Sequence, residues 1–358
     1  VTKQGQKYTG TLLSFDAQQL VLQGETQLYM VQRPDNVQNL EFAALPEGLL
    51  TRPTLVWKVA TEKPGAHMTQ VTYQTKGMGW QADYSVVVNP EDTRMDLSGW
   101  VTLTNKCGAG FKDARVKLIA GDVRKVQPPP APPRAAAPQA ALAAGFGGGF
   151  EEKPFFEYHM YTLGRTTTVN DNQVKQVELL TAADVPVTKR YVFEPGGKYW
   201  HKRYGQGDLY KANVYIEFKN SKEQKLGMPL PKGKIRVYKR DPADQDLEFV
   251  GEDEIDHTPK DEELKLYVGD AFDIVGEKKV TDRKQAQRWR QESVRIELRN
   301  HKAEDIKVLV REHLTAGQWE ITARSQDYKK FDASTIEFEL PVKANGKAEI
   351  TYTVDYRW

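Results

Sequence analysis

Cysteine is almost absent from this chain of 358 residues, in which Cys107 is the only one. A single cysteine cannot form an intramolecular disulfide, and it cannot build a cysteine-based metal site. We therefore expect Cys107 to be a small buried apolar residue rather than a reactive thiol.

Long apolar runs and an excess of one charge sign are also missing. No stretch reaches the ~18 consecutive apolar residues of a membrane-spanning helix, so we expect no transmembrane segment. The 51 Lys and Arg are dispersed among 49 Asp and Glu, and the net charge is +2. We therefore expect no nucleic-acid partner. The chain starts at Val1 rather than Met, which agrees with a processed N-terminus or with a chosen boundary.

The common catalytic motifs do not occur. The sequence has no G-x-S-x-G, no H-E-x-x-H and no P-loop. The glycine-rich "GFGGGF" at 145–150 lacks the preceding strand and following helix that phosphate binding requires. We therefore expect neither an enzyme nor a bound cofactor.

Helical patterns are scarce. The best candidate is "VTDRKQAQRWRQESV" at 280–294, which is mostly polar and has no broad apolar stripe. A helix, a strand edge and a short turn all remain open for this segment.

Alternation of apolar and polar residues dominates instead. In 9–31 it predicts three short strands joined by tight turns, as in a small meander or barrel. In 100–104 the side chains of Trp100, Thr102 and Thr104 share one face, and those of Val101 and Leu103 share the other. Further strands are predicted at 54–60, 68–76, 81–89, 95–105, 114–123, 155–163, 172–180, 187–195, 211–220, 233–240, 263–269, 293–300, 306–314, 318–325, 335–342 and 347–358.

This strand density predicts an all-β protein with tandem immunoglobulin-like antiparallel β-sandwiches, preceded by a small β-meander or barrel. The predicted divisions are 1–48 for the small meander or barrel, 49–220 for the first sandwich and 221–358 for the second. Residues 126–154, rich in Pro, Ala and Gly, are predicted to be a flexible spacer or solvated loop, or a proline-rich ligand for an aromatic groove.

Four stretches together carry a resemblance to a known family. They are "GMGWQADYSVVVN" at 77–89, "GWVTLTNKCGAGFKDARVKLIAGDV" at 99–123, "EYHMYTLGRTTTVNDNQVKQVELL" at 157–180 and "DEIDHTPKDEELKLYVGDAFDI" at 253–274. In order and spacing the chain from about Leu49 to Trp358 resembles DUF4139, a bacterial envelope family related to mucoidy-inhibitor-like proteins. The resemblance implies a secreted or periplasmic protein made largely of strands, with 126–154 as an excursion from within a β-domain. It implies no catalytic residues.

An acidic segment, "GEDEIDHTPKDEE" at 251–263, is the candidate metal site. Asp253, Asp256, His257 and Asp261 are its tentative ligands, because hard cations such as calcium prefer several oxygen ligands. The alternative is a solvated turn, in which Asp256 bonds to nearby backbone and Pro259 fixes the exit.

An aromatic and basic segment, "EPGGKYWHKRYGQGD" at 194–208, is the candidate ligand site. Aromatic rings beside cations can stack on sugars or hold an anionic polysaccharide. The tentative ligand-binding residues are Tyr199, Trp200, His201, Arg203 and Tyr204. The alternative is an ordinary hairpin with alternating faces.

These observations favour a non-enzymatic structural or interaction protein of the bacterial cell envelope or the extracellular space. We expect a periplasmic, outer-membrane-associated or extracellular location. We expect partners to be other envelope proteins or further copies of the chain, joined through edge strands. The rival functions are envelope polysaccharide binding and a metal-dependent, polysaccharide-acting enzyme.

Overall fold

The computed structural model contains two compact units, Val1–Met68 and Thr69–Trp358. The described residues are 1–3, 5–15, 18–32, 37, 41, 56, 58–121, 150–197, 209–314 and 318–358. The boundaries predicted at residues 48 and 220 stay predictions.

The first unit is an antiparallel meander of three strands, β1 (Thr11–Phe15), β2 (Gln19–Gln23) and β3 (Leu28–Gln32). The three predicted strands are therefore confirmed. Leu20 and Val31, which face each other in the β2–β3 register, are buried.

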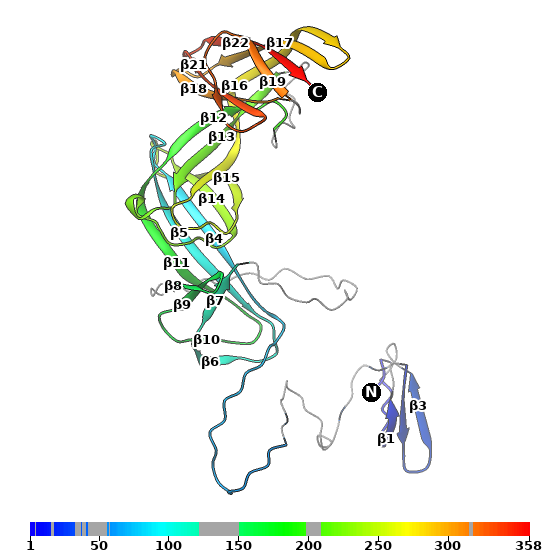
Figure 1. Cartoon of the computed structure of the whole chain (residues 1–358). Coiled ribbons are helices and arrows are strands. Elements are labelled where there is room, and N and C mark those ends of the chain that lie inside the picture. Colours follow the sequence, from blue (N-terminus) through cyan, green and yellow to red (C-terminus); the bar gives the residue numbers. More distant parts are fainter. Residues whose placement is uncertain are drawn as a thin grey trace. The chain divides into compact units, whose positions relative to one another are not determined.

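The second unit is built almost entirely of strands (Figure 1). Its five-stranded sheet has the order β11-β5-β4-β14-β15. These strands are β4 (Met78–Val88), β5 (Arg94–Asn105), β11 (Gln173–Pro186), β14 (Gly233–Arg240) and β15 (Leu247–Ile255). All pairs are antiparallel except β4–β14.

A nine-stranded sheet has the order β19-β22-β17-β16-β13-β12-β18-β21-β20. Its strands are β12 (Thr188–Phe193), β13 (Leu209–Lys219), β16 (Glu263–Ala286), β17 (Trp289–Asn300), β18 (Ile306–His313), β19 (Gln318–Arg324), β20 (Lys329–Lys330), β21 (Thr335–Val342) and β22 (Lys347–Arg357). Only the β12–β18 pair is parallel.

Two small sheets complete the second unit. One pairs β6 (Phe111–Ala114) with β10 (Thr167–Val169), and the other has the order β7-β9-β8. Its strands are β7 (Lys117–Ala120), β8 (Phe150–Phe155) and β9 (Tyr158–Leu163). The helical content of the described chain is one turn of 3-10 helix, η1 (Lys222–Gln224), and no described helix has the length and apolarity to span a membrane.

Alternation places one side of each strand in a core. In β5, Val101 and Leu103 are buried while Trp100 and Thr102 are partly exposed, as predicted. The buried side chains form two clusters. The first core lies mainly on the five-stranded sheet and includes Tyr84, Leu97 and Ile235, and the second lies on the nine-stranded sheet and includes Phe193, Ile296 and Phe338.

Strands β13 and β16 contribute to both cores. Ile216 and Phe218 of β13 pack in the first core, while Ala212 packs in the second. In β16 the same change occurs between Leu266 and Ile274. The two cores are therefore joined by continuous strands.

The structure settles one local alternative and corrects two local predictions. Residues 280–294 form the ends of β16 and β17, because both strands find ladder partners there. The segment 68–76 and the described part of 54–60 are not strands, since they pair with no neighbour. Cys107 is half-buried rather than buried, and its thiol donates to the carbonyl of Ala109 at 3.4 Å.

Candidate functional site: a charged cleft

The structure distributes the four tentative metal ligands over β15 and the turn that follows it. The Asp253 carboxylate accepts the backbone N–H of Glu254 at 2.9 Å and that of Tyr267 at 2.8 Å. Its oxygens are thereby held on the backbone, which is the role of a structural side chain rather than a free ligand.

The other three residues point to separate neighbours. Asp256 is 92% exposed and lies 3.5 Å from the Lys232 ammonium, while His257 Nδ1 accepts the Lys232 N–H at 3.0 Å. Asp261 adopts a φ of 69° and lies 3.6 Å from Lys260 Nζ. Asp253 and Asp256 line one shallow depression with Lys232 and Lys234. Among the described residues, no three His, Cys, Asp or Glu side chains are grouped to hold a metal ion. A calcium site here stays a prediction.

The tentative aromatic site lies outside the described residues. It comprised Tyr199, Trp200, His201, Arg203 and Tyr204. Its part in ligand binding stays a prediction.

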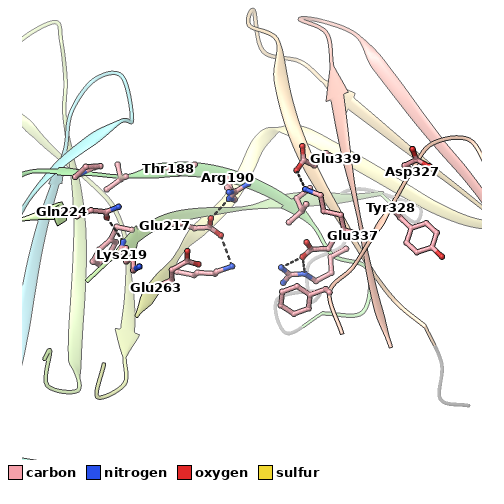
Figure 2. A pocket seen from close by; sticks show the side chains of 18 of the residues that line it. Thr188, Arg190, Glu217, Lys219, Gln224, Glu263, Asp327, Tyr328, Glu337 and Glu339 are labelled. Atoms are coloured by element: carbon pink, nitrogen blue, oxygen red, sulfur yellow. Dashed lines mark hydrogen bonds and ion pairs between the residues drawn. The ribbon is translucent and has the colours of Figure 1, made fainter. Parts of the chain in front are cut away.

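A cleft of about 700 Å³ opens instead on the outer face of the nine-stranded sheet (Figure 2). Side chains of β12, β13, β16, β18 and β21 line it, together with the segment 326–331. We call it the charged cleft. Alternation explains why polar groups gather there: Ile216 and Phe218 enter the first core, so Glu217 and Lys219 between and after them face outward.

One side of the charged cleft carries a row of three ionised groups on adjacent strands. Glu217 of β13 lies between Arg190 of β12 and Lys265 of β16, with an ion pair to each. The Lys265 Nζ to Glu217 Oε1 distance is 3.4 Å, and the Arg190 Nε donates to Oε2. The row fixes Glu217 between two cations.

The opposite side is built around Arg311 of β18. Its Nε and Nη2 donate to one oxygen of Glu337 at 2.9 and 2.7 Å, and its Nη1 lies 3.6 Å from Glu194. The guanidinium stacks 4.7 Å from the ring centroid of Phe331, which is 57% exposed. Burial opposes the charge on Arg311, but the hydrogen bond to Glu337 and the nearby Glu194 outweigh it and raise its pKa. Arg311 is therefore a permanent cation of the cleft wall.

At one end of the cleft lie two opposite charges, Lys219 and Glu263, and the charge of Lys219 also interacts with Glu223. Lys219 and Glu263 face each other directly in the β13–β16 register, and both side chains are exposed. Within the described part of the chain neither makes an ion pair, and Figure 2 draws both at the cleft margin. A ligand that carries a carboxylate or an ammonium can form an ion pair with one of these two side chains.

The charges of the cleft balance. Its five cations are Arg190, Lys219, Lys265, Arg311 and Lys329, and its five carboxylates are Glu217, Glu263, Asp327, Glu337 and Glu339. A net charge of zero gives no long-range attraction for a polyanion. The arrangement suits a ligand that offers both signs or many hydrogen-bonding groups.

A hydroxyl, an imidazole and a carboxylate line up beside the cleft. Thr335 Oγ1 lies 3.3 Å from His313 Nδ1, and His313 Nε2 lies 2.7 Å from Glu194 Oε1. A catalytic nucleophile must reach its substrate, but Thr335 is only 2% exposed. The contacts therefore join β18 and β21 to the residue that follows β12 rather than form a reactive centre.

Sequence reasoning missed the charged cleft because its residues are far apart in the chain, from Pro186 to Glu339. Most of its charged residues are single polar residues on the outer face of a strand, which is typical of any solvated sheet. A usable signal was the pair of opposite charges two positions apart in "YIEFKN" and in "ELKL", which places both signs on one strand face.

The fold and the cleft define an all-β protein with two joined sandwich-like cores and a polar, charge-balanced surface site. Residues 69–358 match the family model of DUF4139, a domain of unknown function, and the chain belongs to this family. A comparison with curated proteins finds no match. The predicted family is therefore confirmed, while the link to mucoidy-inhibitor-like proteins stays a prediction.

Proposed function

We propose that this protein is a non-enzymatic binding protein of the bacterial cell envelope or the extracellular space, and that its ligand lies across the charged cleft. The observation that carries the proposal is the gathering of ten balanced charges in one cleft, eight of them on β12, β13, β16, β18 and β21 and two in the segment 326–331. An envelope or extracellular location is supported by the resemblance of the sequence to envelope proteins.

The cleft is a better candidate surface than the sheet edges. Three of the four terminal strands of the two large sheets carry bulges: β11 after Glu178 and Ala182, β15 opposite Val237, and β19 after Ile321. The fourth, β20, has only two residues. Bulges and short edge strands hinder edge-to-edge pairing between chains. This weighs against self-association through these edges as the main function.

The test blocks the cleft and measures binding. Leu309 is a partly exposed residue of the cleft lining, so the larger ring of Leu309→Trp should take up part of the cleft. Val280→Trp adds the same ring at an exposed site of β16 that does not line the cleft. Calorimetric titration of neutral oligosaccharides and of mixed-charge peptides should find binding that Leu309→Trp weakens by about tenfold or more and Val280→Trp leaves unchanged.

Two results would overturn the proposal. One is that no member of the panel binds, or that Leu309→Trp has no effect on those that do. The other is ordered polymer growth with concentration in light scattering, unaffected by Leu309→Trp, which would assign the function to self-association through edges.

A further inference from the structure

We propose that a proline-rich segment of this chain, residues 127–133, docks into an apolar groove at one end of the five-stranded sheet. The groove has a volume of about 370 Å³, and it is lined by residues of β4, β5, β6, β7 and β10 and by the two residues between β6 and β7 (Figure 1). It shares no lining residue with the charged cleft. The proposal is therefore independent of the function proposed for that cleft.

The lining of the groove is largely apolar. Leu103, Leu118 and Val169 belong to it and are buried. Four further apolar side chains of the lining are only partly covered by the described chain: Met78, Trp80, Phe111 and Val116. Because two of these four are aromatic, the groove has the character of a site for proline-rich peptides, which dock against aromatic side chains.

Strand alternation explains why these side chains meet. Trp80 of β4 faces Leu103 of β5 in the antiparallel register, and both lie on the side of the sheet that carries the first core. Leu118 of β7 packs into the same core. Trp80 is only the third residue of β4, where the core covers it in part. Part of its surface is therefore left for a ligand.

The stretch of chain that contains the prolines lies outside the described residues, and both of its ends lie beside the groove. Gly121, the last described residue before it, is three residues from Leu118, a separation of about 10 Å along the strand. Phe150, the first described residue after it, pairs with Leu163, whose N–H donates to the carbonyl of Val116 at 3.0 Å. Two strand spacings, about 10 Å, therefore separate Phe150 from Val116 of the groove.

The length of the chain permits this docking. The residues between Gly121 and Pro128 span up to about 20 Å when extended, which exceeds the distance back to Leu118. Residues 134–149 are more than enough to return to Phe150. The prolines can therefore reach the groove of their own chain. A tether of this kind gives an effective concentration of about a millimolar, which favours the chain's own segment over that of a second copy.

The sequence of the segment suits an aromatic groove. "QPPPAPP" at 127–133 has five prolines in seven positions and no charge. Proline fixes φ near the value of a polyproline II helix, in which the backbone carbonyls make no internal hydrogen bonds. The indole N–H of Trp80 has no acceptor among the described residues, so it can donate to one of these carbonyls. Proline side chains also lose almost no conformational entropy when they are buried.

Charged ligands match the groove less well. Its described lining residues include two cations, Arg115 and Lys117, and no carboxylate, so a cationic peptide finds no countercharge there. An anion would pair with these cations without using the apolar side chains that make up most of the lining. An uncharged, proline-rich peptide uses the apolar side chains and needs no countercharge.

The first test compares the natural chain with a variant that lacks the prolines. This proline-free variant carries Pro128→Ser, Pro129→Ser, Pro130→Ser, Pro132→Ser and Pro133→Ser. Both chains are labelled with 5-fluorotryptophan, and the fluorine NMR signals of Trp80 and Trp100 are identified by their loss in Trp80→Phe and Trp100→Phe. The Trp80 signal should shift in the proline-free variant, whereas that of Trp100, which lies outside the groove, should not. The shift should persist on dilution.

The second test offers the segment as a separate peptide. A fluorescent peptide of the sequence VQPPPAPPRA should bind the proline-free variant at least about tenfold more tightly than the natural chain, whose groove is already occupied. Adding Trp80→Ala or Met78→Asp to the proline-free variant should weaken the peptide by about tenfold. Trp100→Ala is the matched control and should not. A peptide with serine in place of every proline should bind neither chain.

Any of four results would overturn the inference. The proline substitutions could leave the Trp80 signal in place, or the peptide could bind both chains equally or neither. Trp80→Ala and Trp100→Ala could have equal effects. Finally, a shift that disappears on dilution would assign the segment to the groove of a second copy rather than its own. None of these results bears on the charged cleft, which Leu309→Trp tests separately.

Discussion

The two cores of the second unit share the same hydrogen-bond network around a buried asparagine, but they differ in the polar groups that they bury. In the first core, β5 ends at Asn105, whose Oδ1 accepts the N–H of Cys107 and whose Nδ2 donates to the carbonyls of Ala109 and Asn170. In the second, β17 ends at Asn300, and the same atoms bond to Lys302, Glu304 and Lys343. Each asparagine side chain thus accepts a hydrogen bond from the backbone N–H two residues later. It donates hydrogen bonds to the carbonyl four residues later and to a carbonyl of another segment.

The strands around the two asparagines correspond as well. β5 lies between β4 and β11, and β17 lies between β16 and β22, with all four pairings antiparallel. The turns that receive the Nδ2 groups precede β11 and β22. The cores are therefore built on one three-strand plan, although the sequence has no fixed repeat.

Their interiors differ in charge. In the first core the buried phenols of Tyr84 and Tyr161 donate to the carbonyls of Pro231 and Pro229 at 2.7 and 2.8 Å. Burial raises the pKa of both phenols, which keeps them neutral. These polar groups are satisfied by backbone, without an ion.

The second core buries an ionisable cluster. Glu312 is fully buried, and its Oε2 accepts hydrogen bonds from Lys278 and from the Tyr352 hydroxyl. Burial and the nearby Glu312 raise the pKa of Tyr352. Glu312 directly follows Arg311, so β18 presents one charge to the cleft and one to the core. The strand that forms the cleft wall is therefore anchored on both faces by charged groups.

Breaking the buried cluster should give the largest difference between the cores. Glu312→Ala removes the acceptor of the buried Tyr352 hydroxyl and of the half-buried Lys278 ammonium, and should cost about 4 kcal/mol of unfolding free energy. Tyr84→Phe, in the first core, removes one neutral hydrogen bond and should cost about 1 kcal/mol. Urea unfolding monitored by tryptophan fluorescence compares the two. A loss in Glu312→Ala no larger than that in Tyr84→Phe would contradict a special role for the cluster.

Removing the buried asparagine that the two cores share should lower the unfolding free energy by similar amounts in both. Asn105→Ala deletes three hydrogen bonds of a buried amide and Asn300→Ala deletes four, one of them long at 3.5 Å, so each should cost about 3 kcal/mol. Thermal unfolding should therefore shift by similar amounts in the two variants. A shift in only one variant would show that the two asparagines have the same geometry but contribute differently to stability.

A smaller, pH-dependent effect is expected where the two sheets are tied together. Asp92, in the turn between β4 and β5, pairs with Lys189 of β12 at 2.6 Å and Lys239 of β14 at 2.5 Å. Burial acts to raise the Asp92 pKa, but the two lysines outweigh it and lower it. Its stabilising effect is therefore full above the unfolded-state pKa of about 3.9, and is lost as the pH falls through the lower folded-state pKa.

Asp92→Asn should thus cost about 2 kcal/mol at neutral pH and progressively less below about pH 4. Asparagine tolerates the φ of 57° at this position, so the turn is retained. Asp305→Asn, which removes an exposed partner of Lys343, is the matched control and should have the smaller effect. A pH-independent loss in Asp92→Asn would point to the turn rather than to the charges.

Alternation in the sequence was sufficient to predict most strands, because strands such as β5 and β18 bury one face against a core. It failed for β15, since Glu248, Glu252 and Glu254 give this edge strand the composition of a loop. It also gave no measure of the length of β16, whose far end is polar and exposed yet held by ladder bonds to β17.

The site was less predictable than the fold. Arg190, Glu217 and Arg311 become neighbours only when β12, β13 and β18 assemble, and nothing local distinguishes them from other surface residues. The buried position of Glu312 was equally hidden, although its place in the alternation of β18 puts it on the core side. Both the cleft and the burial of Glu312 depend on which strands become neighbours. No local pattern in a single sequence specifies that order.

The passage of β13 and β16 through both cores also has a mechanical consequence. Modules joined by a flexible linker bend and stretch at the linker. Here the antiparallel pairing of the two strands extends from Leu209 opposite Glu277 to Lys219 opposite Glu263, with register shifts after Lys211 and after Val214. Tension applied across the second unit is therefore carried by two covalent backbones and the hydrogen bonds between them rather than by a linker.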